Sequence, residues 1–457
     1  MNRIIEPGIF KAYDVRGIYP TTLNEEIAER IGKAYVTLTK AKTVVIAQDM
    51  RPSGEILKPA LIKGVQAMGA SVIEIGLAST DLFYFAVHHL KTDGGIMVTA
   101  SHNPKQYNGF KMVREHAVPI GEGSGMEQIR DLVFGNAFVP IHARKPTQST
   151  AAVLNAFTDF IFSFVAPSAI APLKVVLDAG NGMACVVAPH ILKRMKLEEI
   201  RQCFELDGNF PNHEANPLVE ENRRDVIARV IAEKADLGIA WDGDADRCFF
   251  IDNRGRFVAG DFITGVIAER MLRQHPQGTV MFDVRSSRFV SDRITAAGGK
   301  PKMLRVGHAF FKHAMREGHA IFGGEVSGHY YYHDQQQFFA DNGYIPALQI
   351  LELVSELKRS GTTLAAFLDR ALQGYCISGE INSRVKNSDE ILRKLAAVFA
   401  DGKLYYLDGL SVEYPDWHFN VRVSNTEPLL RLNLEATSQE KMEHMREQIL
   451  SIIRGTS

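Results

Sequence analysis

Short apolar runs alternate with segments of helical period over most of the chain. Residues 43–49 (TVVIAQD) are typical of a strand, residues 53–69 carry apolar side chains at helical spacing, and residues 71–76 (SVIEIG) are again typical of a strand. Equivalent blocks begin at Leu173 and at Gly278. Strands that alternate with helices indicate parallel sheets covered by helices on both faces. The pattern therefore predicts three similar α/β domains.

The pattern changes near residue 368. Strand-like runs follow one another closely between residues 377 and 436, and segments of helical period occupy residues 388–400 and 438–453. This arrangement is typical of a smaller α+β domain. We therefore expect an α/β protein with three mixed α/β domains and a C-terminal α+β domain, whose ranges are residues 1–147, 148–253, 254–368 and 369–457.

Composition and charge narrow the class of protein. The chain has 52 basic and 53 acidic residues, so no general positive field attracts nucleic acid or an anionic membrane. Its four cysteines form no CxxC pair, which argues against a disulfide framework and a cysteine zinc site. The N-terminus lacks the apolar run of a secretory signal, and the most apolar stretch, residues 160–171, is too short for a membrane span. We expect a cytoplasmic protein with no nucleic-acid or membrane partner; the sequence does not give the oligomeric state.

Polar, glycine-bearing loops follow three of the predicted strands. They lie at the ends of GGIMVTASHNP (residues 94–104), DLGIAWDGDADR (residues 236–247) and AIFGGEVSGH (residues 320–329). Open α/β sheets bind ligands beyond the carboxyl ends of their strands. Three similar domains could therefore present three different loops to one shared cleft.

The first loop carries Ser101 where a strand changes to a turn. A hydroxyl in this position is suited to act as a nucleophile or phosphoryl acceptor. His102 is its neighbour, and Lys111 follows one short loop later. The GxSxG pattern of a hydrolase is absent from TASHN, which disfavours a Ser–His–Asp triad. The alternative is an ordinary turn, because Ser, Asn, Pro and Gly all favour turns.

The second loop alternates three carboxylates with small residues, at Asp242, Asp244 and Asp246. Crowded carboxylates raise one another's pKa, and a divalent cation relieves this repulsion. Carboxylate oxygens are hard ligands that suit Mg²⁺. A calcium EF-hand is disfavoured because Asn253 stands at its twelfth position and a strand precedes the loop. Arg247, the next residue, could clamp a phosphate. The alternative for the whole loop is a solvated acidic turn.

Two further loops suit the binding of a sugar and of an anion. In GEVSGH, Glu325 and Ser327 could bind vicinal sugar hydroxyls, while the glycines permit close approach. RVSNTEP (residues 422–428) combines a guanidinium with hydroxyl and amide donors, which suits an anion nest. Arg431 could add charge unless the strand alternation turns it away. The alternative for GEVSGH is a structural loop without a ligand, and the alternative for RVSNTEP is a polar hairpin turn. Together, the four loops meet the requirements of phosphoryl transfer.

In these motifs and in their order, the sequence resembles the α-D-phosphohexomutase superfamily, and within it the bacterial phosphomannomutases. The resemblance rests on FKAYDVRGIYP, TASHNP, DGNFPNHEANP, DGDADR, GEVSGH and RVSNTEP, which together extend over nearly the whole chain. It implies four domains around a central cleft. It also implies a phosphosugar substrate, Mg²⁺, and a hexose 1,6-bisphosphate that primes the enzyme by phosphorylating it.

The resemblance implies roles for individual residues. Ser101 matches the phosphoserine, and Lys111 and His329 are candidates for the general acid and base. The residues that match catalytic positions are Ser101, His102, Lys111, Arg247 and His329. The residues that match metal ligands are Asp242, Asp244 and Asp246, with the phosphoryl group on Ser101. The residues that match substrate-binding positions are Tyr13, Arg16, Arg285, His308, Glu325, Ser327, Arg422, Ser424, Asn425 and Thr426. Arg285 departs from some relatives, which carry a lysine there.

The implied reaction interconverts mannose 6-phosphate and mannose 1-phosphate and supplies GDP-mannose synthesis. Ala245 and Val326 differ from the DGDGDR and GEQSGH strings of amino-sugar mutases, which disfavours an amino-sugar substrate. Three alternatives remain: an enzyme that acts on both glucose and mannose phosphates, a metal-dependent sugar phosphatase, and a sugar-phosphate sensor without activity.

Overall fold

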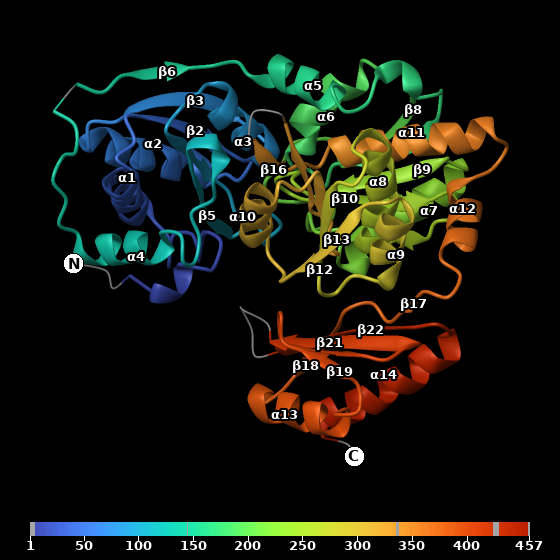
Figure 1. Ribbon diagram of the computed structural model, residues 1–457. Helices are drawn as coiled ribbons and strands as arrows, with labels where there is room; N and C mark the ends of the chain where they lie inside the picture. Colours follow the sequence, from blue (N-terminus) through green and yellow to red (C-terminus); the bar gives the residue numbers. More distant parts are fainter. Residues whose placement is uncertain (1–4, 144, 335–337, 424–428, 456–457) are drawn as a thin grey trace. The chain divides into compact units, whose positions relative to one another are not determined.

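The computed structural model describes residues 5–143, 145–334, 338–423 and 429–455 (Figure 1). The chain divides into two compact units. The first comprises residues 1–258 and 327–365, and the second comprises residues 259–326 and 366–457. Within the described ranges, no helix combines the length and the apolar character that crossing a bilayer requires.

The first unit begins with a six-stranded sheet of order β1-β5-β4-β2-β3-β6. Its strands are β1 (Val15–Ile18), β2 (Thr43–Gln48), β3 (Ser71–Leu77), β4 (Gly94–Val98), β5 (Tyr107–Arg114) and β6 (Gln148–Thr150). Strand β2 runs parallel to β3 and β4. The strands and the helix predicted over residues 43–76 are confirmed.

Helices cover both faces of this sheet. They are α1 (Glu25–Thr39), α2 (Gly54–Ala67), α3 (Thr80–His89) and α4 (Met126–Gly135). Val44 and Ile46 belong to one core with α1, α2 and α4. On the other face, a Cβ at Gly95 would lie 2.6 Å from the ring of Phe83 on α3. Because both faces are covered, β2 is apolar along nearly its whole length rather than alternating.

The second sheet of the first unit has the order β11-β10-β9-β7-β8. Its strands are β7 (Lys174–Asp178), β8 (Glu198–Gln202), β9 (Leu237–Trp241), β10 (Cys248–Asp252) and β11 (Phe257–Val258), with helices α5 (Leu154–Phe162), α6 (Ala184–Leu192) and α7 (Arg224–Glu233). The unit also contains β15 (Tyr330–His333), β16 (Phe339–Asp341) and α11 (Ile345–Arg359).

The sheets are mixed rather than purely parallel, which corrects one expectation from the hydrophobic pattern. Strand β5 runs antiparallel to β4, and β10 runs antiparallel to β9. The connecting loops, residues 99–106 and 242–247, are too short for the crossover that a parallel neighbour requires. Each loop therefore forms a hairpin at the carboxyl end of a buried strand, where a ligand can reach it.

The second unit contains three parallel strands and an antiparallel sheet. The parallel strands are β12 (Thr279–Asp283), β13 (Lys300–Leu304) and β14 (Phe322–Gly324), with helices α8 (Gly260–Gln274), α9 (Arg288–Ala296) and α10 (His308–Gly318). Helix α12 (Leu364–Ala371) leads toward the antiparallel sheet.

The antiparallel sheet has the order β17-β22-β21-β20-β19, and β18 also pairs with β22. Its strands are β17 (Cys376–Ile377), β18 (Ile381–Arg384), β19 (Lys403–Tyr405), β20 (Leu410–Glu413), β21 (Trp417–Val423) and β22 (Leu429–Ala436). Helices α13 (Ser388–Val398) and α14 (Gln439–Arg454) pack on this sheet (Figure 1). The predicted mixed α/β and α+β fold class is confirmed, whereas the predicted domain boundaries and the shared cleft stay predictions.

Candidate functional site

The hairpin loop between β4 and β5 holds Ser101 in a left-handed conformation, with φ 51°. The side chain is buried. The Ser101 backbone N–H donates a hydrogen bond to Thr99 Oγ1 at 2.9 Å, and Thr99 Oγ1 donates to Asp49 Oδ2 at 2.6 Å. A positive φ at a non-glycine residue persists only where its surroundings hold it. These bonds therefore fix the place of the hydroxyl.

A buried arginine that the sequence analysis missed fastens the same loop. The Arg51 guanidinium donates to the carbonyl oxygens of Ser101, Asn103, Pro104 and Tyr107 at 2.7, 2.6, 2.9 and 3.0 Å. Its Nε donates to Asp49 Oδ2 at 3.2 Å. The sequence did offer one sign of this contact: the charged residues Asp49 and Arg51 directly follow β2, at the sheet edge where the neighbouring strand β4 also ends.

The Ser101 hydroxyl faces the acidic loop between β9 and β10. Its Oγ lies 3.1 Å from His102 Nδ1 and 3.4 Å from Asp242 Oδ2. Burial, together with the guanidinium groups of Arg247 and Arg16, lowers the pKa of His102 well below its usual value, so the imidazole is neutral near pH 7. The structure thus brings together a hydroxyl and a carboxylate that lie far apart in the sequence.

Three buried aspartates and one lysine form the centre of this site. Oxygen atoms of Asp242, Asp244 and Asp246 lie within 4.8 Å of one another. Lys111 Nζ donates to Asp244 Oδ2 and to Asp246 Oδ2, each at 2.6 Å. Thr80 Oγ1, at the start of α3, donates to Asp244 Oδ2 at 2.5 Å. The lysine side chain comes from β5, so both hairpins contribute to the cluster.

The charges in this cluster depend on one another. Burial raises the pKa of Asp242 and, with repulsion from Asp244, raises the pKa of Asp246 well above its usual value. Burial also opposes ionisation of Asp244, but Lys111 outweighs it and lowers the pKa of Asp244. The two aspartates in turn raise the pKa of Lys111 against the effect of burial. Positive charge is therefore what this site stabilises.

The donor set fits a hard divalent cation. Among the residues that the structure describes, Asp244 Oδ1 and Asp246 Oδ1 are buried without a hydrogen-bond partner. A buried acceptor that lacks a partner costs about 1–3 kcal/mol. Carboxylate oxygens in such a cluster are the ligands that Mg²⁺ prefers. Asp242, Asp244 and Asp246 could therefore hold Mg²⁺.

Basic and polar groups surround the aspartates. Arg247 Nε donates to Asp242 Oδ2 at 2.7 Å, and His329 Nε2 lies 3.7 Å from Asp246 Oδ1. Ser327 Oγ lies 3.1 Å from His329 Nδ1. An isolated antiparallel bridge joins the backbones of Arg247 and His329. Five of the residues predicted from DGDADR and GEVSGH are thus adjacent in the first unit.

The N-terminal candidates lie beside the Ser101 loop. Arg16 Nη1 donates to Asn103 Oδ1 at 2.6 Å, and Arg16 Nε donates to Asp14 Oδ2 at 2.8 Å. Tyr13 is half-buried, two residues before β1. Arg16 therefore reaches the hydroxyl-bearing loop, while the substrate-binding roles of Arg16 and Tyr13 stay predictions.

In the second unit, Arg285 lies just beyond the carboxyl end of β12 and contacts three carboxylates. Its Nε and Nη2 donate to the two oxygens of Asp283 at 2.9 and 2.8 Å. Its Nη2 lies 3.8 Å from Glu325 Oε1, and its Nη1 lies 3.5 Å from Glu380 Oε2. Glu325 Oε1 also accepts the Gly307 N–H at 2.9 Å, which places Glu325 next to the start of α10, where His308 is the first residue. Arg285 thus connects the predicted sugar loop to Glu380.

Glu380 gathers three guanidinium groups. Arg422 Nη2 donates to Glu380 Oε2 at 3.0 Å, and Arg431 Nη1 donates to Glu380 Oε1 at 2.9 Å. Burial opposes ionisation, but Arg285, Arg422 and Arg431 lower the pKa of Glu380 to about 2. Guanidinium groups arranged around a pair of anionic oxygens are suited to binding phosphate. The sequence analysis did not identify Glu380. The candidates Ser424, Asn425 and Thr426 lie outside the described residues.

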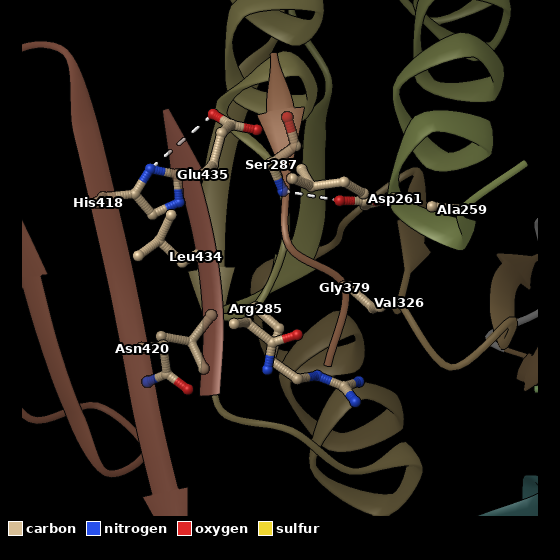
Figure 2. A pocket seen from close by; sticks show the side chains of 13 residues that line it. Ala259, Asp261, Arg285, Ser287, Val326, Gly379, His418, Asn420, Leu434 and Glu435 are labelled. Atoms are coloured by element: carbon tan, nitrogen blue, oxygen red, sulfur yellow. Dashed lines mark hydrogen bonds and ion pairs between the residues drawn. The ribbon is translucent and has the colours of Figure 1, made fainter. Parts of the chain in front are cut away.

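A small cavity of about 30 Å³ lies beside this cluster, within the second unit (Figure 2). Strand residues His418, Asn420 and Glu435 line it together with Asp261 and Ser287. His418 Nδ1 lies 3.9 Å from Glu435 Oε1, and the Ser287 N–H donates to Asp261 Oδ2 at 2.8 Å. A space of this size has room for water but not for a sugar phosphate.

Glu435→Gln should change how the stability of the second unit depends on pH. Burial raises the pKa of Glu435 to about 7 from its ordinary 4.5, so the stabilisation from its protonated form is complete below pH 4.5 and is lost as pH rises through 7. We expect the free energy of unfolding of the variant, relative to that of the parent, to rise by about 2 kcal/mol from pH 5 to pH 8. Urea unfolding at each pH measures this difference. Glu443→Gln, on the exposed face of α14, is the matched control; the same gain in both variants would contradict the assignment.

Family profiles match the chain in four consecutive segments. They describe the phosphoglucomutase/phosphomannomutase α/β/α domain I over residues 7–139, domain II over residues 154–255 and domain III over residues 259–375. The fourth describes the C-terminal domain of the same proteins over residues 380–452.

Individual relatives match over almost their whole length. The chain is 42% identical to a Xanthomonas campestris pv. campestris protein named "Phosphohexose mutases", over 98% of this chain and 99% of that one. It is 42% identical to an Escherichia coli K12 phosphomannomutase, over 96% and 97% of the two chains. The crystal structure of a phosphoglucomutase/phosphomannomutase family protein from Burkholderia thailandensis matches with a TM-score of 0.87 and 31% identity, over 99% and 98% of the two chains.

Proposed function

Because this chain belongs to the phosphoglucomutase/phosphomannomutase family of phosphoryl-transferring isomerases, we propose that it is a phosphomannomutase that interconverts mannose 6-phosphate and mannose 1-phosphate. Relatives named phosphomannomutase from Escherichia coli, Salmonella and Vibrio cholerae, at 40–42% identity, support the mannose assignment. The name of the Xanthomonas relative specifies a phosphohexose rather than mannose, which leaves room for a second candidate, an enzyme that acts on both glucose and mannose phosphates.

One observation carries this proposal: the Ser101 hydroxyl lies 3.4 Å from Asp242 Oδ2, at the edge of a buried acidic cluster that includes Lys111. A hydroxyl that accepts a phosphoryl group needs positive charge nearby to stabilise the transferring oxygens. Lys111 and Arg247 carry that charge, and Mg²⁺ held by the three aspartates would add to it. A sugar phosphatase could use the same cluster, but it would have no need for the arginines around Glu380.

In the proposed reaction, phosphorylated Ser101 donates its phosphoryl group to O1 of a hexose 6-phosphate. The bond from phosphorus to Oγ breaks, a bond from phosphorus to O1 forms, and a base takes the O1 proton. The hexose 1,6-bisphosphate then turns end for end. The bond from phosphorus to O6 breaks, a bond from phosphorus to Ser101 Oγ forms, and the proton taken from O1 returns to O6. Mannose 1-phosphate leaves, and a hexose 1,6-bisphosphate would prime any enzyme that has lost its phosphate.

The contacts support different roles for the two acid–base candidates. Lys111 donates to two carboxylates and stays an ammonium ion, so it can act as an acid or stabilise charge but is poorly suited to accept a proton. His329 lies at the rim of the cluster, with Ser327 at its Nδ1. We therefore assign the base to His329. The mannose 1-phosphate formed would supply GDP-mannose synthesis.

A paired assay tests the proposed function. The measured quantities are kcat/KM for mannose 1-phosphate and for glucose 1-phosphate on one preparation, together with the intact mass of the protein. We expect at least about a tenfold preference for the mannose substrate, because the two sugars differ in the orientation of a hydroxyl that the site must bind. We also expect a fraction of the protein to carry one additional phosphoryl group. Equal kcat/KM values would favour the second candidate, and release of inorganic phosphate without isomerisation would favour a phosphatase.

A further inference from the structure

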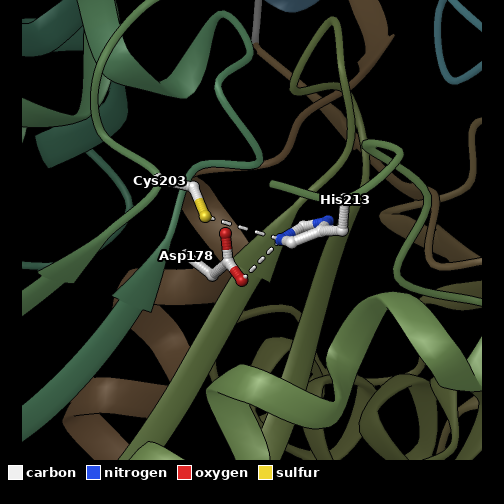
Figure 3. A group of neighbouring side chains, drawn as sticks. All are labelled: Asp178, Cys203 and His213. Carbon is white, nitrogen blue, oxygen red and sulfur yellow. Dashed lines mark hydrogen bonds and ion pairs between the residues drawn. The ribbon is translucent and has the colours of Figure 1, made fainter. Parts of the chain in front are cut away.

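Asp178, Cys203 and His213 lie together in the first unit (Figure 3), and none of them is among the residues assigned to phosphoryl transfer. Asp178 is the last residue of β7 and pairs in register with Gln202, the last residue of the parallel strand β8. Cys203 is the next residue, and His213 comes from the loop that follows. Adjacent parallel strands end at the same edge of a sheet, which brings these segments together.

The three donor atoms have the spacing of a tetrahedral metal site. His213 Nε2 lies 3.1 Å from Asp178 Oδ2 and 3.7 Å from Cys203 Sγ, and one donor atom from each residue lies within 4.8 Å of the others. Zinc bonds of about 2.0–2.3 Å at tetrahedral angles separate neighbouring donors by about 3.3–3.6 Å. The two distances from His213 Nε2 lie within a few tenths of an ångström of these separations, and the third pair lies within 4.8 Å.

The orientation of the ring favours an ion over a catalytic relay. In a thiol–imidazole–carboxylate relay, the nucleophile and the acid contact opposite ring nitrogens. Here Cys203 and Asp178 both face Nε2 of His213, as the two dashed lines in Figure 3 show. His213 Nδ1 instead lies 2.9 Å from the Glu214 carbonyl oxygen, which can only accept a hydrogen bond. Nδ1 therefore carries a proton. Nε2 donates to the Asp178 carboxylate and must release its own proton before its lone pair can bind a metal.

Backbone hydrogen bonds hold the other donors in place. Asp178 Oδ1 accepts the Gly180 N–H at 2.8 Å, which leaves Oδ2 to face His213. The Cys203 carbonyl accepts the Asn181 N–H at 2.8 Å. The Asp178 side chain is 2% exposed and the His213 side chain 10% exposed. Such fixed outer contacts are what orient the ligands of a metal site.

Solvent reaches the cluster on one side. Cys203 lines an open cavity of about 470 Å³, together with Gln202, Asn212, Asp225 and Arg229. An ion can enter through this opening. A water molecule from the same cavity can complete a tetrahedral set that has three protein ligands.

We propose that Asp178, Cys203 and His213 bind one Zn²⁺ ion, separately from the aspartates that suit Mg²⁺. A thiolate and an imidazole are soft and borderline ligands that favour Zn²⁺, whereas Mg²⁺ prefers oxygen alone. The Cys203 thiol and His213 Nε2 each release a proton to solvent as their bonds to zinc form.

The bound ion would brace the neighbouring acidic loop. The Gly243 N–H donates to the Ala215 carbonyl at 3.1 Å, and the Gly243 carbonyl accepts the Met183 N–H at 2.8 Å. Ala215 follows His213 closely, and Met183 lies in the segment that begins at Asp178. An ion that joins Asp178 to His213 therefore ties together the two segments that hold Gly243.

Cobalt(II) tests the site by a spectroscopic signal that requires the thiolate. With excess Mg²⁺ present to compete at the aspartates, we expect one Co²⁺ per chain to produce a near-ultraviolet band of thiolate-to-cobalt charge transfer. Zn²⁺ should displace the Co²⁺ and abolish the band. A folded parent protein that shows no band would overturn the proposal, because oxygen ligands alone cannot produce it.

Matched variants assign the ligands. Cys203→Ser should abolish the band and weaken Zn²⁺ binding at least about 100-fold in competition with a chromophoric chelator, since loss of an outer contact alone weakens a metal site 10–100-fold. Cys376→Ser, at another half-buried thiol, should leave both readouts unchanged. Likewise, His213→Asn should weaken Zn²⁺ binding and His190→Asn should not.

Circular dichroism of each variant without metal shows whether it is folded, and every readout is independent of the sugar substrate. A band that survives in folded Cys203→Ser would overturn the proposal whether or not the mutase assignment holds. If Cys203→Ser does not fold, then His213→Asn with its control decides.

Discussion

Ser101→Ala should reduce isomerisation at least about 10⁴-fold while the protein stays folded. The variant lacks the oxygen that would carry the phosphoryl group, and losses of this size are typical when a covalent nucleophile is removed. The neighbouring hydroxyl of Thr99 cannot replace it, because that group donates to Asp49 Oδ2 at 2.6 Å.

The same change should alter the free energy of unfolding by only about 1 kcal/mol. Ser101 Oγ lies 3.1 Å from His102 Nδ1 and 3.4 Å from Asp242 Oδ2, whereas Arg51 fixes the loop through backbone carbonyls that alanine retains. Alanine and serine also bear a positive φ at similar cost. A loss of activity accompanied by native stability therefore indicates a chemical role for the hydroxyl.

Assays in both directions and intact mass measure the effect. Ser163→Ala, an exposed hydroxyl at the end of α5 that donates to the Phe160 carbonyl at 2.7 Å, is the control. We expect the additional phosphoryl mass to disappear in Ser101→Ala and to persist in Ser163→Ala. Full isomerisation by Ser101→Ala, or a phosphoryl group on another residue, would contradict the proposed mechanism.

The sequence predicted those parts of the site that depend on local order. Ser101 and the three aspartates each follow a buried apolar strand, and the carboxyl end of such a strand is where open α/β sheets present ligand-binding loops. The alternation of Asp242, Asp244 and Asp246 with small residues indicated a shared cation. The structure places these side chains in contact, whereas their catalytic roles stay predictions.

The groups that the sequence did not identify act through long-range contacts. Arg51 reaches the Ser101 loop across two neighbouring strands, and the string DMRPSG in which it lies is typical of an ordinary turn. Between residues 376 and 384 the structure has two short strands, β17 and β18, with Gly379 between them at φ 67°. That break places Glu380 among the arginines, and no local pattern indicates it.

Spacing rules also missed the Asp178, Cys203 and His213 cluster. Rules for zinc sites rely on pairs such as CxxC, in which two ligands lie on one turn. In this cluster each ligand comes from a different segment, and only the parallel pairing of β7 with β8 brings Asp178 next to Cys203. The absence of cysteine pairs excluded a local motif, and it could not exclude a site assembled by the fold.

Lys111→Met should lower the free energy of unfolding of the first unit by about 3–5 kcal/mol when no divalent cation is present. Removal of one partner from a buried ion pair leaves an uncompensated charge, and losses of this size are typical. Lys111 Nζ lies 2.6 Å from an oxygen of Asp244 and 2.6 Å from an oxygen of Asp246, and both aspartates are buried. Methionine resembles lysine in length and leaves little space unfilled, so electrostatics rather than packing should dominate.

Mg²⁺ should reverse much of this loss. A cation held by the three aspartates supplies the charge that the ammonium supplied, and a ligand that binds only the folded state stabilises it. Urea unfolding with EDTA and with Mg²⁺ measures both effects. The control is Lys33→Met, which breaks a surface pair with Glu29 at 2.7 Å and should cost about 0.5 kcal/mol without a specific response to Mg²⁺.

The two responses to Mg²⁺ separate structural from chemical roles of the lysine. If Mg²⁺ restores stability to Lys111→Met but not activity, the aspartates hold the ion and the ammonium acts on the substrate or the phosphoryl group. If Mg²⁺ restores both, the lysine serves mainly to neutralise the cluster. A destabilised variant whose stability Mg²⁺ leaves unchanged would contradict the assignment of the three aspartates as its ligands, because their unpaired oxygens would then be most in need of a cation.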